Sequence, residues 1–334
     1  MGGLANVGNT CSINTLVQCL GYCDTFRNEL LNNIHFCKKK DRKFSIGDEF
    51  KMIIKQLWVD NHSLVPIRFI HALQETIGSN FKVGREEMDI TEVFMIVLDN
   101  MIEESHDINA KIDFYKPYNN DNKLNKYLNN KTIEIWKLHN KLGNSLLLNL
   151  FQGTLIQQVR CKSCEYICHN IEPFKFIHIN TSDPNIVSFT EHLQKYFNPV
   201  SVPDWKCDKC NSNDNNEKLI KIWNFPKIIV FILNRYKDDG TKCSIPIKIP
   251  NKISFACGAE MKYPEKSKEY RIKSIANHEG DTIYSGHYNA MCYNKENQNW
   301  VIHDDIRISK VKKETADNIL SFSTNAYAIF YELV

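Results

Sequence analysis

The sequence lacks any long apolar run and any excess of charge. Nowhere do about eighteen apolar residues follow one another, and the N-terminus lacks the charged-then-apolar pattern of a secretory signal. With 42 basic and 39 acidic residues, the formal net charge is only +3. We therefore expect no membrane partner, no secretion and no general attraction to nucleic acid, so partners have to be inferred from local sites.

The sequence also lacks internal repeats, and no signal directs its twelve cysteines to an oxidising compartment. No period of roughly 20 to 50 residues recurs, which excludes a solenoid or a propeller. We expect the cysteines to stay as thiols or to bind metal, as they do in the cytoplasm or nucleus. The 43% hydrophobic content suffices for one large domain or a few closely packed subdomains.

The apolar pattern changes near Phe151, which predicts an α+β fold. Before it, apolar residues recur at helical spacing; after it, short runs are rich in β-branched and aromatic residues. The stretch 118–131 is crowded with Asn and Lys, which predicts a solvated insertion or a frayed surface segment. The helical stretches are 14–22, 46–77 and 90–101, and the clearest strand-like runs are 153–159, 228–233 and 327–331.

Cys11 is the first candidate for chemistry. It follows the turn Gly8-Asn9-Thr10 and precedes the first helical stretch. A helix N-terminus lowers the pKa of a thiol and favours the nucleophilic thiolate. The glycine would let backbone N–H groups point at a developing oxyanion, and Asn6 offers a side-chain amide nearby. On its own, a cysteine after such a turn also fits a plain buried thiol.

A base and two carboxylates occur far downstream. His287 stands beside Gly286, where the backbone allows close approach of a substrate. A predicted strand ends in Asp304 and Asp305, and either could accept the imidazole N–H. The order Cys, His, Asp is that of papain-like proteases. A satisfied loop histidine is the alternative for His287.

Two cysteine pairs have the spacing of a zinc site. Cys161 and Cys164 form one C-x-x-C pair, and Cys207 and Cys210 form the other. Each pair can occupy two corners of a Zn²⁺ tetrahedron, and four thiolates leave no open position, so we expect a structural metal. Unpaired surface thiols are the alternative. A redox pair is disfavoured, because no βαβ pattern surrounds either motif.

Together, these segments resemble the sequence boxes of the ubiquitin-specific proteases, a family of deubiquitinases. The stretch from Gly3 to Cys11, continued by Asn14, Leu16 and Gln18, is similar to the family's cysteine box. The likeness continues through a Gln-Gln-Asp box, a Phe-Gln-Gly segment before the first cysteine pair, a Leu-Lys-Arg-Phe strand, a histidine box and a closing strand. In that order these are residues 89–94, 151–153, 226–236, 270–288 and 326–331.

The resemblance implies a papain-like cysteine protease fold in one catalytic domain, residues 1–334, shaped as a right hand. A helical thumb would cover 1–148, zinc-bearing β fingers that grip ubiquitin would cover 149–225, and a β palm would cover 226–334. It also leads us to expect a bare catalytic domain without an appended recognition domain.

Carried over position by position, the resemblance assigns catalytic roles to four residues. Cys11 becomes the nucleophile, His287 the base, Asp304 the carboxylate that orients the base, and Asn6 a donor to the oxyanion. Asp305 would be either a supporting carboxylate beside Asp304 or a solvated loop residue.

The resemblance also assigns three residues to the tail of ubiquitin. Asp89 would hold the backbone of the tail, while His278 and Tyr288 would line its channel. Asp89 also stands where a helix N-cap is expected, and such a cap contributes about 1 kcal/mol without any substrate.

The sequence departs from the family pattern at a few positions. Glu87 and Met88 stand where the family has two glutamines, Ser12 replaces a bulky aromatic after the cysteine, and His303 replaces the aromatic before the aspartate. None of these changes removes a triad member. The basic run 38–43 could be a nuclear address, although such runs are more often solvated faces.

We therefore expect a thiol-dependent deubiquitinase that hydrolyses the bond after the C-terminal glycine of ubiquitin and carries structural Zn²⁺. Its partners would be ubiquitin and ubiquitinated proteins, and it would act as a monomer in the cytoplasm or nucleus. Three alternatives stay open: a protease for another ubiquitin-like modifier, a protease for ordinary peptide bonds, and a non-catalytic ubiquitin-binding module. Intact Cys11, His287 and Asp304 argue against the last.

Overall fold

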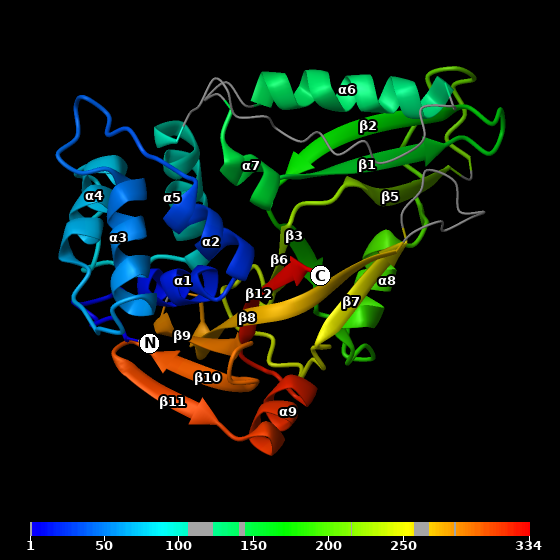
Figure 1. Ribbon diagram of the computed structural model, residues 1–334. Helices are drawn as coiled ribbons and strands as arrows, with labels where there is room; N and C mark the ends of the chain where they lie inside the picture. The colour runs from blue at the N-terminus through cyan, green and yellow to red at the C-terminus, as the bar shows by residue number, and fades with distance from the viewer. Residues whose placement is uncertain (1, 106–122, 140–143, 215, 257–266, 284) are drawn as a thin grey trace.

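The computed structural model describes residues 2–105, 123–139, 144–214, 216–256, 267–283 and 285–334. Figure 1 shows three parts: a helical layer from the first third of the chain, a large sheet packed against it, and a smaller sheet beneath one long helix. Helices and strands are thus largely segregated along the chain, and the predicted α+β class is confirmed.

The helical layer is built from amphipathic helices whose caps match the sequence. The side chains of Ser45 and Asp89 accept hydrogen bonds from the first turns of α3 and α5, while Pro66 and Gly78 delimit α4. The first helix begins at Cys11, earlier than its apolar pattern indicated. The helices are α1 (Cys11–Gly21), α2 (Asp24–Asn32), α3 (Ile46–Trp58), α4 (Ile67–Ile77), α5 (Ile90–Glu104) and α7 (Leu146–Phe151).

The large sheet has eight strands in the described part of the chain. Its order is β11-β10-β9-β8-β12-β6-β3, with β7 paired to β8, and its pairs are antiparallel apart from β3 and β6. The strand that follows all others in the sequence, β12, lies between β8 and β6. The strands are β3 (Ile177–Asn180), β6 (Ile228–Asn234), β7 (Lys252–Ala256), β8 (Ser267–Thr282), β9 (Ser285–Asn294), β10 (Asn299–Asp304), β11 (Arg307–Val311) and β12 (Ala326–Leu333).

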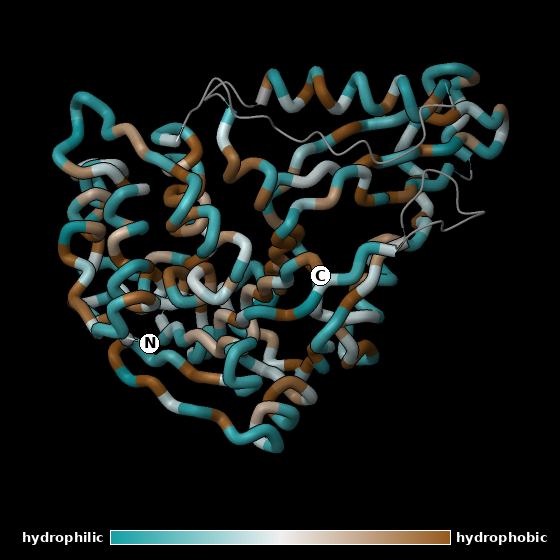
Figure 2. Tube along the Cα trace, viewed as in Figure 1, coloured by the Kyte–Doolittle hydropathy of each residue, from teal (hydrophilic) through white to brown (hydrophobic). Residues whose placement is uncertain are grey.

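Each face of the large sheet buries its own core, which explains the unbroken apolar run 228–233. Val230 belongs to the core beneath the helical layer, whereas Phe231 belongs to the core on the opposite face. That second core includes residues from α8 (Phe189–Phe197) and α9 (Lys313–Ser321). In Figure 2 the hydrophobic segments accordingly gather where the helices meet the strands.

The smaller sheet carries α6, and here the sequence prediction was wrong. The stretch 118–131 was expected to lack regular structure, yet α6 begins at residue 123; residues 118–122 lie outside the described residues. Leu128 and Trp136 are fully buried, and the indole N–H of Trp136 donates to Thr154 Oγ1 at 2.8 Å. The sheet order is β2-β1-β5-β4. The elements are α6 (Lys123–His139), β1 (Gly153–Arg160), β2 (Ile167–Phe174), β4 (Val200–Ser201) and β5 (Glu217–Asn224).

Helix α6 forms because a narrow apolar stripe packs on the small sheet, and tertiary packing overrides the poor helix propensity of the asparagines.

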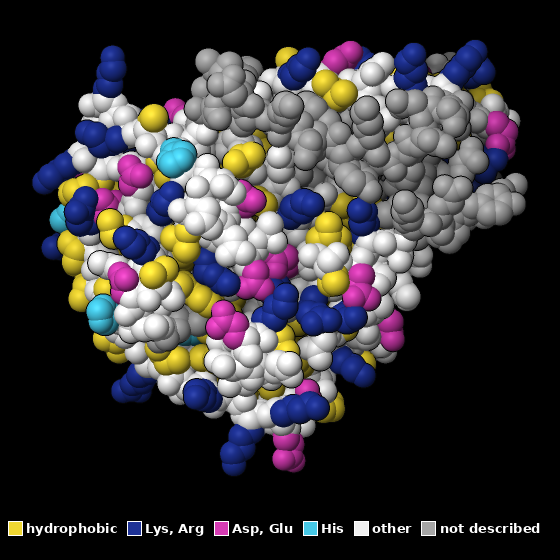
Figure 3. All heavy atoms as spheres, viewed as in Figure 1, with side chains coloured by type: hydrophobic (Ala, Val, Ile, Leu, Met, Phe, Trp, Pro, Cys, Tyr) yellow, Lys and Arg dark blue, Asp and Glu magenta, His cyan; other side chains and the backbone are white. Residues whose placement is uncertain are grey.

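None of the described helices is long and apolar enough to cross a membrane. On the face in Figure 3, Lys and Arg side chains are interspersed with Asp and Glu, in keeping with the nearly balanced composition.

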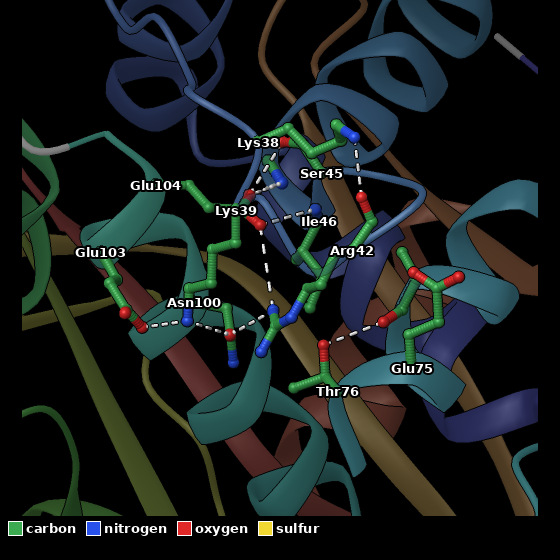
Figure 4. A network of polar contacts seen from close by, with 12 residues as sticks. Lys38, Lys39, Arg42, Ser45, Ile46, Glu75, Thr76, Asn100, Glu103 and Glu104 are labelled. Carbon is green, nitrogen blue, oxygen red and sulfur yellow. Dashed lines mark hydrogen bonds and ion pairs between the residues drawn. The ribbon is translucent and has the colours of Figure 1, made fainter. Parts of the chain in front are cut away.

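A buried carboxylate joins two helices of the layer. Glu104, at the end of α5, accepts hydrogen bonds from the Ser45 hydroxyl at 2.8 Å and from the N–H groups of Ile46 and Gly47 at 3.2 and 2.8 Å (Figure 4). These N–H groups belong to the first turn of α3, and N–H groups in the first turn of a helix have no acceptor within the helix itself. Arg42 lies 3.9 Å from the same carboxylate.

The basic run 38–43 makes further contacts with α5. Lys39 pairs with Glu103, and Arg42 donates to Asn100 Oδ1 at 2.7 Å (Figure 4). Lys38 Nζ donates back to the Arg42 carbonyl at 2.7 Å. Lys39 and Arg42 therefore hold the segment before α3 against α5, and the run is not a purely solvated face.

Replacing Glu104 with Ala should lower the free energy of unfolding by about 3 kcal/mol, because it leaves buried donors of α3 unsatisfied. Urea denaturation measures this loss. The matched change Glu103→Ala removes a more exposed carboxylate and should cost about 0–1 kcal/mol. Equal losses in the two variants would contradict the capping role.

Candidate active site

Cys11 is the first residue of α1, at the point where this helix packs on the large sheet. The turn before it is fixed, because the Asn9 N–H donates to the Gly84 carbonyl at 2.8 Å and Gly8 has a φ of +116°. A Cβ at position 8 would lie 2.0 Å from the Gly84 oxygen, so a larger residue does not fit. The predicted place of Cys11 at a helix N-terminus is confirmed.

Burial dominates the electrostatics of the Cys11 thiol. Loss of solvent raises its pKa; the N–H groups of Tyr288 and Ser12 lower it, while Asp305 and Glu87 raise it further. The net shift is upward. The expectation that the helix N-terminus favours the thiolate of the free protein is therefore wrong, because desolvation outweighs the N–H donors. To act as a nucleophile, the thiol would therefore have to give its proton to a base.

His287 and Asp304 form a hydrogen-bonded pair on neighbouring strands. His287 lies near the start of β9, Asp304 ends β10, and His287 Nε2 lies 2.6 Å from Asp304 Oδ1. A carboxylate only accepts, so this bond places a proton on Nε2 and leaves Nδ1 as the acceptor nitrogen. Both side chains are about 40% exposed, which leaves the pair open to a substrate.

The structure brings Cys11 against β9, the strand that carries His287. The Cys11 sulfur lies near the N–H of Tyr288, the residue that follows His287. Among the described residues no hydrogen bond joins the thiol to the imidazole, and such catalytic contacts often tighten only with substrate. Nδ1 makes no other hydrogen bond there, and is free to receive the thiol proton.

Asp305 connects the N-terminal segment to the turn after β10. Its carboxylate accepts from Asn6 Nδ2 at 2.9 Å and from Asn14 Nδ2 at 2.8 Å, and its carbonyl accepts from the Leu4 N–H at 3.1 Å. Asn6 Oδ1 accepts from the N–H and hydroxyl of Thr10. The Asn6 amide is thus fixed, with one Nδ2 hydrogen free to point at an oxyanion. Asp305 supports these amides and does not lie free in solvent.

Asp89, Tyr288 and His278 also come together. Asp89 Oδ1 accepts from the Thr91 N–H at 2.7 Å, so the capping role is present, and Asp89 Oδ2 accepts from the Tyr288 hydroxyl at 3.2 Å. The ring centroids of Tyr288 and His278 are 4.4 Å apart. Burial raises the pKa of Tyr288 and lowers the pKa of His278 to about 4, so both are neutral near pH 7.

Two further tyrosines complete this aromatic cluster and were missing from the predicted site. Tyr236 hydrogen-bonds His278 Nδ1, and its ring lies 5.8 Å from that of Tyr327. Tyr327 in turn lies 6.2 Å from Tyr288. Both tyrosines lie in segments that resemble family boxes, and this resemblance could have identified them as site residues. Their convergence depends on the pairing of β12 with β6 and β8, which periodicity does not reveal.

The positions that depart from the family pattern fit their surroundings. His303 is buried, contacts the Tyr22 hydroxyl through Nε2 at 2.9 Å, and has its pKa lowered by burial to about 4. Ser12 is buried, and its Oγ has no partner among the described residues. Met88 is buried while Glu87 is exposed, so only Glu87 offers a polar group to the surface.

The four predicted metal ligands converge at one end of the smaller sheet. The first pair lies in the β1–β2 turn and the second before β5, and the pairing of β1 with β5 brings the two together. All four sulfurs lie within 4.8 Å of one another, and two of the separations, Cys161 to Cys210 and Cys164 to Cys207, are 3.6 and 3.7 Å. A zinc–sulfur distance of about 2.3 Å implies tetrahedron edges of about 3.8 Å, so the cluster can hold a metal ion.

The pKa values of the cysteines in this cluster also favour a bound metal ion. Burial raises the pKa of Cys161, but the N–H groups of Cys164 and Ser163 and the neighbouring thiols lower it to about 7. The Tyr166 N–H lowers the pKa of Cys164, yet burial and the other sulfurs raise it to about 12. One thiolate thus keeps its neighbours protonated, and a cation is what allows all four to ionise together.

The family model described as Ubiquitin carboxyl-terminal hydrolase matches residues 2–331. The chain is 24% identical over 350 residues to Ubiquitin carboxyl-terminal hydrolase 2 of Bos taurus, covering 100% of this chain and 55% of the relative. It is 25% identical over 338 residues to Ubiquitin carboxyl-terminal hydrolase Usp2 of Drosophila melanogaster, covering 99% of this chain and 34% of the relative. The chain therefore spans about a third to a half of these curated relatives.

Solved structures share the fold. In the SAGA Ubp8/Sgf11/Sus1/Sgf73 DUB module bound to ubiquitin aldehyde, a chain with 21% identity superposes with a TM-score of 0.74, covering 100% of this chain and 70% of that one. A structure of the module bound to monoubiquitin gives the same TM-score, 0.74. The predicted protease fold is confirmed.

In the free protein, alkylation of Cys11 by iodoacetamide should accelerate with pH up to and beyond about pH 9, because the pKa of the thiol lies above its ordinary value of 9.0. Only the thiolate reacts, so the rate follows deprotonation. Mass spectrometry of the peptide that contains residue 11 measures it. His287→Ala should leave this profile unchanged; a wild-type plateau already reached near neutral pH would show a preformed thiolate–imidazolium pair instead.

Proposed function

Since this chain belongs to the ubiquitin carboxyl-terminal hydrolase family, we propose that it is a thiol-dependent deubiquitinase that hydrolyses the bond after the C-terminal glycine of ubiquitin. The observation that carries this proposal is the placement of Cys11, at the start of α1, against the strand that bears the hydrogen-bonded His287–Asp304 pair. A neutral thiol against the strand that carries a histidine with a free Nδ1 has the parts that acyl transfer needs.

The reaction begins with transfer of the Cys11 proton to His287 Nδ1. The thiolate attacks the glycine carbonyl, and the free N–H of Asn6 with nearby backbone N–H groups stabilises the oxyanion. The amine of the acceptor takes a proton from His287 as it leaves, so the base is restored and a thioester remains. Water then loses a proton to His287 and attacks the thioester. The Cys11 thiolate leaves and takes that proton back, and the released ubiquitin carboxylic acid ionises in water. Asp304 keeps the imidazole in the required tautomer.

The tail of ubiquitin would lie in the aromatic cluster around Asp89. The rings of Tyr288 and Tyr327 flank this carboxylate, which is the acceptor that a backbone N–H of the tail requires. A channel narrowed by tyrosines admits glycine and excludes larger side chains, so selection for the Gly-Gly tail follows from sterics.

The four-cysteine cluster would hold structural Zn²⁺. When bound, the ion would tie the β1–β2 turn to the segment before β5. We assign residues 1–148 to a thumb, 149–225 to fingers and 226–334 to a palm, with the fingers gripping the body of ubiquitin. The similar Ubp8 module was solved bound to ubiquitin aldehyde, which supports ubiquitin as the partner.

We further propose an oligomeric state and a cellular location for the protein. The chain would act as a monomer on ubiquitin and ubiquitinated proteins, although Ubp8 stands in a module with Sgf11, Sus1 and Sgf73. Free thiols and a thiolate metal site suit the cytoplasm or nucleus, which are reducing.

Ubiquitin with a propargyl group at its C-terminus should form a covalent adduct with the wild-type protein. Cys11→Ala should abolish the adduct and retain ubiquitin binding, while Cys37→Ala, which removes an exposed thiol, should react as wild type does. Gel mobility and mass spectrometry detect the adduct. Binding without reaction would favour a ubiquitin-binding module, and reaction only with a probe made from another modifier would favour a protease for that modifier.

Purified protein should contain about one zinc per chain by elemental analysis. Cys207→Ser should lose the metal and several kcal/mol of stability in the smaller sheet. Cys168→Ser is the matched control, since Cys168 lies on β2 outside the cluster. Full zinc content in Cys207→Ser would contradict the ligand assignment.

A further inference from the structure

A cavity of about 390 Å³ adjoins the catalytic pair on the side away from the tail cluster. It is bounded by β8, β9, β10 and the segment where α9 ends, and both His287 and Asp304 line it. The proposed binding of the ubiquitin tail does not use this space.

The alternation of side chains along β9 separates the two sites. Tyr288 and Ala290 face the core beneath the helical layer, on the side of Asp89 and the tail cluster. His287, Asn289 and Met291 face the cavity. His287 therefore stands at the boundary, with the acyl side of a substrate on one side and the leaving-group side on the other.

The cavity is lined by both apolar and polar side chains, and its edge carries a charge. Ile302 and Ile319 contribute partly exposed apolar side chains, while Asn277 and Asn289 place amide groups between them and the edge. Glu279 Oε1 accepts from Asn289 Nδ2 at 2.7 Å, which holds this carboxylate and leaves its second oxygen available. Lys242, a cation that reaches the same region, donates to the His278 carbonyl and to Asn325 Oδ1.

An exposed aromatic side chain completes the cavity. Phe322 lines it and is 72% exposed, although its backbone is well anchored. The neighbouring Ser323 exchanges hydrogen bonds with Ile247, and its carbonyl accepts from the buried Arg235 at 2.8 Å. Phe322 is thus held at the rim with its ring uncovered. A single exposed ring is ordinary, but this one borders the catalytic pair.

We propose that this cavity binds the acceptor lysine, the residue whose ε-nitrogen carries ubiquitin. The apolar stem of a lysine matches the ring of Phe322 and the side chains of Ile302 and Ile319, and the carboxylate of Glu279 suits the positive charge that develops on its nitrogen as the amine leaves. The amide nitrogen is neutral in the substrate, takes a proton from His287 as it leaves, and becomes an ammonium in water at neutral pH. The inference rests on the proposed deubiquitinase activity, and it makes Phe322 and Glu279 determinants of the acceptor.

Two substrates that share ubiquitin and differ in the leaving group test this site. One joins ubiquitin to the ε-amine of lysine in a short fluorescent peptide, and the other joins it to aminocoumarin, an aryl amine without an alkyl chain. The ratio of the two kcat/KM values isolates the acceptor, because effects on ubiquitin binding cancel. Phe322→Ala should lower the isopeptide-to-aryl ratio about fivefold and Glu279→Gln about threefold, the latter less at high salt.

Matched variants control for shape and charge. Tyr127→Ala removes another exposed ring, on α6, and Glu296→Gln removes a carboxylate from the β9–β10 turn, and both should keep the wild-type ratio. Circular dichroism checks that every variant folds. Wild-type cleavage of both substrates with an unchanged ratio in Phe322→Ala and Glu279→Gln would overturn the acceptor site alone. Failure of the wild type on both substrates would overturn the deubiquitinase proposal and the acceptor site with it.

Discussion

The packing of α1 on β9 is the contact on which the rest of this site depends. It places the first residue of a buried helix, Cys11, beside the N–H of Tyr288, and so joins two segments from opposite ends of the sequence. Because α1 is buried over most of its length and the middle of β9 is buried against it, their relative position is fixed by the core and not by the side chains of the candidate site. The cost is an unfavourable environment for a thiolate, since the burial that positions Cys11 also raises its pKa. The packing thus fixes the position of the Cys11 sulfur while it disfavours the thiolate, so the proposed nucleophile would need a base such as His287.

Much of this could be predicted from the sequence where the signal is local. The turn before Cys11, the cap at Asp89 and the two C-x-x-C pairs are short motifs, and the structure places them where the motifs indicate. The pKa of Cys11 could not be predicted, because desolvation is set by side chains distant in sequence. Helix α6 was missed for a related reason: its asparagines have poor propensity, and the sheet that stabilises it through Leu128 and Trp136 is formed by residues downstream. Tyr236 and Tyr327 joined the site only through strand pairing.

The candidate site is also held by hydrogen bonds between polar side chains, in addition to the apolar core beneath it. Asp305 has a φ of +52° and bonds Asn6 and Asn14 through one carboxylate, which ties the turn after β10 to the N-terminal segment. Such a backbone conformation is uncommon outside glycine and is accepted where contacts on all sides compensate. His303 lies two residues before Asp305, on β10, at a position where the family pattern has an aromatic residue, and its Nε2 is 2.9 Å from the buried Tyr22 hydroxyl. Two separate sets of polar contacts therefore fix the segment 303–305, one at each end.

The position of β12 bears on how this protein can be made. This strand follows every other element in the sequence, yet it lies between β8 and β6 inside the large sheet. While a ribosome is still synthesising the chain, the sheet has an open gap with two unpaired edges, and apolar residues from both cores are uncovered. Closing such long-range pairing is slow and leaves the nascent protein dependent on protection from aggregation. It also means that a chain synthesised only as far as β8 lacks the strand that joins β8 to β6, so the large sheet that carries the candidate site is still divided in two.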